Sequence, residues 1–101
     1  MELKTAIRMI IFDFTLRLEI DSIPLERTCI CHVVETVSKL MKEMKETLGT
    51  NSFESLLKEL NDQKREQKGD TEVWIVHGKL RGCYSLKHFL HVLLDFADKL
   101  N

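Results

Sequence analysis

Residues 10–20 read Ile-Ile-Phe-Asp-Phe-Thr-Leu-Arg-Leu-Glu-Ile, and the interpretation of the whole chain depends on this stretch. From Phe12 to Ile20, apolar residues alternate with polar or charged residues without a break, which is the period of a β-strand with one buried face. Apolar residues at 7, 9 and 11 extend the pattern back toward Thr5 on the opposite face. The pattern therefore predicts one long strand that begins near Thr5 and has a solvated side.

The segment after this strand predicts a turn and then an amphipathic helix. Pro24 fixes its own backbone and disfavours helix at the residue before it, so the strand ends near residues 21–24. Apolar residues then recur at helical spacing, with charged residues on the opposite face, from Leu25 or Thr28 to Leu48. Gly49 is placed to end this helix.

The second half of the chain predicts another helix, a loop, a strand and a final helix. Asn51 and Glu54 have the spacing of a capping box, which indicates a helix start at Asn51. Residues 61–70 contain no apolar side chain and predict a mobile polar loop. Residues 71–82 predict a second strand, in which Gly78 indicates a bulge or a close backbone approach. Ser85 is placed to cap a last helix that is apolar along one face to the C-terminus.

These elements predict a single α+β domain over residues 1–101, in the order β-α-α-β-α. The two helices after the first strand would return the chain so that the second strand runs antiparallel to the first. Two strands make a poor sheet, and the exposed edge of a long apolar strand invites pairing with another chain. We therefore expect the sheet to be completed or covered by dimerisation.

Composition limits the environment and the partners of the chain. Its 101 residues are 44% hydrophobic and 31% charged, as in an ordinary globular domain, and fifteen basic against sixteen acidic residues give a net charge of −1. That balance gives no overall field that would attract nucleic acid or anionic lipid. An odd number of cysteines, with no signal peptide and no membrane span, predicts a soluble, cytoplasmic or otherwise intracellular protein with reduced thiols.

Cysteine and histidine residues are the candidates for metal binding or nucleophilic chemistry. Structural zinc sites usually present pairs of ligands with two to four residues between them, and no such pair of cysteines occurs here. Cys83 follows two basic residues, but no base is placed to activate it. We therefore expect no metal, no cofactor and no enzymatic activity. The candidate ligands are Cys29, Cys31, His32, His77, Cys83, His88 and His91.

A local group of basic residues supports one alternative function. Trp74 and Tyr84 lie near it in the sequence and could stack on bases. The alternative is a small dimeric nucleic-acid-binding protein that uses this patch without a recognised motif. The patch consists of Lys64, Arg65, Lys68, Lys79 and Arg81.

The function that the sequence favours is a non-enzymatic protein–protein interaction module. It would be a small regulator, adaptor or inhibitor that binds itself as a homodimer and a further protein, and its size suggests a viral or mobile-element origin. The strand edge from Phe12 to Ile20 or the outer face of the last helix would form the contact. The predicted contact residues are Phe12, Phe14, Leu16, Leu18, Trp74, His88 and His91.

Overall fold

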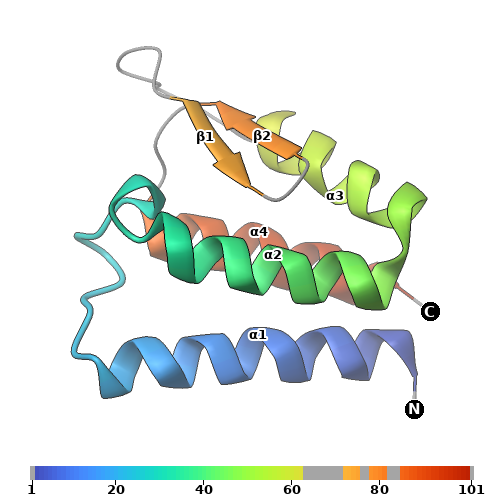
Figure 1. The fold of residues 1–101 in the computed structure, drawn as a ribbon. Helices are drawn as coiled ribbons and strands as arrows, with labels where there is room; N and C mark the ends of the chain where they lie inside the picture. Colours follow the sequence, from blue (N-terminus) through green and yellow to red (C-terminus); the bar gives the residue numbers. More distant parts are fainter. Residues whose placement is uncertain (1, 63–71, 76–77, 82–84, 101) are drawn as a thin grey trace.

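Four α-helices and a short β-hairpin make up the computed structural model, which describes residues 2–62, 72–75, 78–81 and 85–100. Helix α1 lies along one side of the molecule against α2 and α4, and α3 and the hairpin lie on the opposite side of that pair (Figure 1). The elements are α1 Leu3–Ile20, the 3-10 turn η1 Ile30–His32, α2 Val34–Leu48, α3 Thr50–Asp62, β1 Glu72–Ile75, β2 Gly78–Arg81 and α4 Leu86–Asp98.

Helix α1 replaces the long first strand that the alternating pattern predicts, so the α+β fold class is wrong and the domain is helical. A helix satisfies its backbone hydrogen bonds within the segment, whereas a long strand needs a partner strand to do so. Within the described residues, the only strands are the two of the hairpin. No glycine or proline interrupts residues 3–20, so the segment forms a continuous helix that packs one side against its neighbours.

The end of α1 is a Schellman motif. The Ser22 N–H donates to the carbonyl of Glu19, and the Ile23 N–H donates to the carbonyl of Leu18, both at 3.0 Å. Ser22 takes the left-handed conformation that this motif requires, with φ 57°. The predicted chain reversal before Pro24 is therefore present, and it follows a helix rather than a strand.

Helix α2 begins at Val34, later than the start predicted at Leu25 or Thr28. The preceding loop is held by the start of α4, because the N–H groups of Leu86 and Lys87 donate to the carbonyls of Thr28 and Leu25. These bonds link positions far apart in the sequence, so periodicity gives no indication of them. They leave the segment before Val34 as loop and 3-10 turn.

The other helix boundaries agree more closely with the sequence. Helix α2 ends at Leu48, and Gly49 has φ 87° and ψ 165°, a conformation that glycine adopts readily and other residues rarely do. Helix α3 begins at Thr50, so Asn51 is not its N-cap as predicted. Ser85 does cap α4, since its hydroxyl accepts a hydrogen bond from the His88 N–H at 3.1 Å.

The predicted second strand is a hairpin of two shorter strands. Residues 72–75 pair antiparallel with 78–81, in the register Glu72 to Arg81 and Trp74 to Lys79. Gly78 begins β2 and is not a mid-strand bulge. Of the predicted polar loop 61–70, residues 61–62 belong to α3, and residues 63–70 lie outside the described part of the chain.

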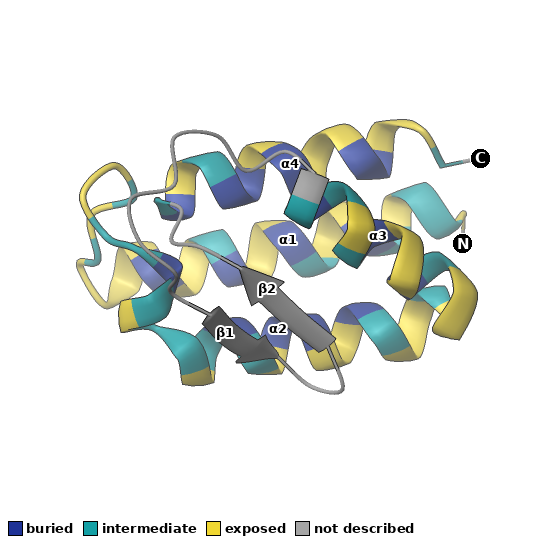
Figure 2. Ribbon diagram, turned by 90° about the horizontal axis from the view of Figure 1, so that it is seen from above, coloured by how far each residue is buried: buried dark blue, intermediate teal, exposed yellow. Residues whose placement is uncertain are grey.

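One hydrophobic core joins the four helices, and its buried residues form stripes along their facing sides (Figure 2). Where side chains are described, the buried residues are all hydrophobic. Burial of this apolar surface is the main force that holds the helices together. The core consists of Ile7, Ile11, Phe14, Leu18, Ile30, Val37, Leu40, Met41, Met44, Phe53, Leu56, Leu60, Leu86, Phe89, Leu90, Val92, Leu93, Phe96 and Ala97.

Candidate functional site

The outward face of α1 carries an apolar stripe that the rest of the described chain leaves exposed. Successive residues turn by about 100° around a helix, so this stripe lies about 180° from the buried one. Its most exposed members are Phe12, at 70%, and Ile20, at 74%. We call the stripe, together with Leu94 of α4, the α1 surface. It consists of Met9, Phe12, Leu16, Ile20 and Leu94.

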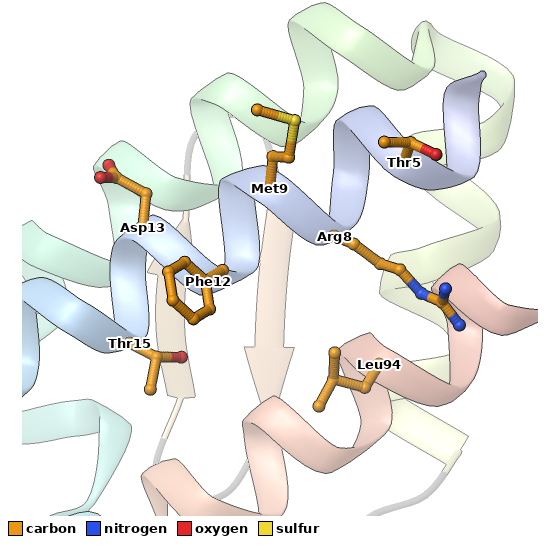
Figure 3. Close-up of a pocket in the computed structure, with 7 residues that line it drawn as sticks. All are labelled: Thr5, Arg8, Met9, Phe12, Asp13, Thr15 and Leu94. Atoms are coloured by element: carbon orange, nitrogen blue, oxygen red, sulfur yellow. The ribbon is translucent and has the colours of Figure 1, made fainter. Parts of the chain in front are cut away.

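The α1 surface includes an open depression of about 730 Å3 next to α4. Met9, Phe12 and Thr15 of α1 and Leu94 of α4 are among the residues that line it. Figure 3 shows Met9 and Phe12 projecting from α1 and Leu94 projecting from α4. The apolar surface is therefore continuous across two helices and has a recess into which an apolar side chain fits.

Charged residues of both signs flank the α1 surface. On the side of α4, Arg8 lines the depression and forms an ion pair with Asp98 of α4. Helical spacing places Glu19 on the same side, about three turns further along. On the side of α2, Asp13 and Arg17 line a small recess that also includes Lys39 and Glu43 of α2. Asp13 lines the depression as well. An apolar centre with a charged, solvated border is the usual organisation of a protein-binding surface.

Only part of the predicted contact set lies on the α1 surface. Phe12 and Leu16 are on it, but Phe14 and Leu18 are buried in the core, because a helix separates residues that a strand would place on one face. The side chain of Trp74 lies outside the described part of the structure. The prediction missed Met9 and Leu94, although the spacing of 9, 12, 16 and 20 matches a helical stripe.

The two predicted contact histidines lie on α4, away from the apolar stripe. His88 is half-buried near the start of the helix, and its N–H is the group that Ser85 caps. His91 is exposed, with its Nε2 atom 3.6 Å from an oxygen of Asp95 one turn later. Neither residue lines the depression, so the structure does not join them to the α1 surface.

Only two of the five residues of the predicted basic patch belong to the described part of the chain. Lys64, Arg65 and Lys68 lie outside the described residues. Lys79 and Arg81 belong to β2, which packs near α3 on the far side of the molecule from α1. The nucleic-acid alternative remains a prediction.

The cysteine pair differs from the prediction of reduced thiols. Cys29 and Cys31 form a disulfide in the loop before α2, with their Cα atoms 5.2 Å apart. Cys83 and His77 are outside the described residues. Across the described part of the chain, no three or more His, Cys, Asp or Glu side chains gather in a way that could hold a metal ion.

One lysine has a perturbed pKa. The Lys99 ammonium group donates to Glu59 Oε1 at 2.7 Å, joining the C-terminal end of α4 to α3. This hydrogen bond and the negative charge of Glu59 raise the pKa of Lys99 above its ordinary value. The pair lies on the surface and has the geometry of a structural contact.

None of the helices that the structure describes has the length and apolar character needed to cross a membrane. Comparisons with protein-family models, with curated proteins and with solved structures found no match to this chain.

Proposed function

We propose that the protein is a non-enzymatic protein-binding module and that the α1 surface is its contact. The observation that carries the proposal is the pair of opposite apolar stripes on α1. The stripe of Ile7, Ile11, Phe14 and Leu18 is covered by the protein's own core, and the outward stripe has no cover among the described residues. The free energy falls when another apolar surface covers a face of this kind and excludes water from it.

The size of the α1 surface fits such a role. Its five residues are exposed by 55% (Met9), 70% (Phe12), 43% (Leu16), 74% (Ile20) and 43% (Leu94). With about 200 Å2 for a fully exposed residue of this size, they present roughly 600 Å2. This is the upper end of the largest apolar patch on an ordinary monomer, about 300–600 Å2. The remaining area of a standard contact, about 800 Å2 per partner, would come from the charged border.

The test is affinity capture with the full chain and two matched variants. Phe12→Asp introduces a charge at the centre of the α1 surface, and because Phe12 is largely exposed the fold tolerates the change. Asn51→Asp adds the same charge to an exposed position on α3, on the other side of the molecule. We expect the captured proteins, including further copies of this chain, to be lost with Phe12→Asp and retained with Asn51→Asp.

Two results would contradict the proposal. Proteins that bind all three forms equally would show that the contact is elsewhere on the molecule. Captured nucleic acid whose retention falls steeply with added salt, and does not depend on Phe12, would support the basic-patch alternative.

A further inference from the structure

We propose that a second copy of this chain occupies the α1 surface, with its α1 antiparallel to the first. This inference rests on the proposed function and names the partner. A two-fold axis near the level of Phe14, in the plane of the contact and perpendicular to α1, would relate the two copies. Such an interface is self-complementary, because each residue contact occurs twice.

The apolar residues are spaced for this arrangement. With an axis at that level, Phe12 of one copy lies opposite Leu16 of the other, and Met9 lies opposite Ile20. Each large side chain therefore meets an apolar partner. Two copies would cover roughly 600 Å2 of apolar surface on each chain. Together with the border, this approaches the roughly 800 Å2 per partner of a stable interface.

The charged border fits the same pairing. When two helices pack antiparallel, each flank of one helix faces the same flank of the other. On the α4 side, Arg8 then faces the second copy's Glu19, while it also pairs with Asp98 of its own chain. On the α2 side, Asp13 faces the second copy's Arg17. Both flanks bring opposite charges together, and the two-fold axis doubles each contact.

Leu94 distinguishes the antiparallel from the parallel orientation. It lies on the α4 side of α1, beside Phe12. In the antiparallel pair the α4 side of one copy faces the α4 side of the other. The two copies of Leu94 therefore approach each other across the axis and extend the apolar contact. In a parallel pair Leu94 would face the α2 side and bury against Asp13 of the second copy. Removing water from a carboxylate by placing an apolar side chain against it is costly.

The test uses two charge-reversal variants, alone and mixed. Asp13→Lys sets a lysine against the partner's Arg17, and Arg17→Glu sets a glutamate against the partner's Asp13. Each variant alone therefore has repulsion at two symmetric positions, and we expect its homodimer to weaken on the order of tenfold. In the mixed dimer both contacts become attractive again. The effect of each substitution on its own chain is the same in the homodimers and in the mixed dimer. It therefore cancels when the amounts of these dimers are compared.

The readout is native mass spectrometry of an equimolar mixture, because the two variants differ in mass. Antiparallel pairing predicts that mixed dimers make up clearly more than the half of all dimers that random mixing gives. Lys58→Glu, a charge reversal at an exposed position of α3, should dimerise as the wild type does. Random mixing of the two variants would overturn the antiparallel pairing. A parallel pair would also fail to show the excess, since its mixed dimer keeps repulsive contacts with Arg8 and Glu19.

The failures of the two proposals can be told apart. A dimer that is lost in Phe12→Asp but shows no excess of mixed dimers would overturn the antiparallel pairing and leave the α1 surface as the contact. A wild-type chain that stays monomeric at all concentrations would overturn self-pairing, and the capture experiment would then decide the proposed function. A dimer that Phe12→Asp does not affect would contradict both.

Discussion

Truncation of Phe14 and of Phe12 to alanine should have very different effects on folding stability. Phe14 is 6% exposed and packs in the core, whereas Phe12 is 70% exposed on the opposite side of α1. Removal of a buried phenylalanine ring typically costs about 3–5 kcal/mol. The covered part of Phe12 is about 60 Å2, and since alanine retains some of that contact the loss is at most about 1 kcal/mol.

Chemical denaturation monitored by circular dichroism measures both variants directly. The expected difference between them is about 3 kcal/mol, or roughly 15 °C in Tm for a domain of this size. The effect of Phe12→Ala should grow with protein concentration if the α1 surface pairs with a second copy, because association stabilises the folded state by mass action. The effect of Phe14→Ala should not.

The same pair of variants tests the helix itself. In a strand, residues 12 and 14 would lie on one face and would be buried or exposed together. Equal losses of stability in Phe12→Ala and Phe14→Ala would therefore refute the helical assignment of α1 and, with it, the separation of a core stripe from an outward stripe.

Three further predictions concern the backbone and one surface ion pair. Gly49→Ala should lower the free energy of unfolding by about 1–2 kcal/mol through its backbone conformation alone, since nothing lies within 4 Å of the added Cβ; an unchanged Tm would contradict this. Ser22→Gly should raise stability by about 0.5 kcal/mol, because relief of the left-handed conformation exceeds the added entropy of the unfolded chain; a lower Tm would contradict it. The raised pKa of Lys99 means that its contact with Glu59 stabilises the fold below the ordinary lysine pKa of 10.5, and that this contribution is lost as pH rises above it. The Tm difference between wild type and Glu59→Gln should therefore narrow between about pH 9 and about pH 12, and a constant difference would contradict the assignment.

The sequence predicts α4 and the part of α2 from Val34 to Leu48 well, because each has a single apolar stripe with charged residues opposite. Helix α1 differs, because apolar residues at every second position from Phe12 to Ile20 fit a strand and also fit two opposite helical stripes. Periodicity alone does not separate these possibilities. A strand would bury all of these apolar residues on one face, whereas a helix leaves one apolar stripe exposed to water. Because that exposure is unfavourable in an isolated chain, the alternation favours the strand.

The residues of the candidate site could likewise be identified from the sequence only in part. Phe12 and Leu16 could be identified as candidate contact residues because their large apolar side chains lie in an unbroken pattern with charged residues. Leu94 could not, since it joins the α1 surface only through the packing of α4 against α1, which depends on contacts far apart in the sequence. The late start of α2 has a similar cause, because hydrogen bonds from Leu86 and Lys87 hold the preceding loop.

The most direct measurement of the central claim is sedimentation equilibrium of the wild-type chain and of Phe12→Asp over the same range of concentrations. We expect the wild type to form dimers as concentration rises, and the variant to remain a folded monomer. If both proteins form dimers equally, the α1 surface is not the contact between copies; if the wild type stays monomeric, the chain does not pair with itself.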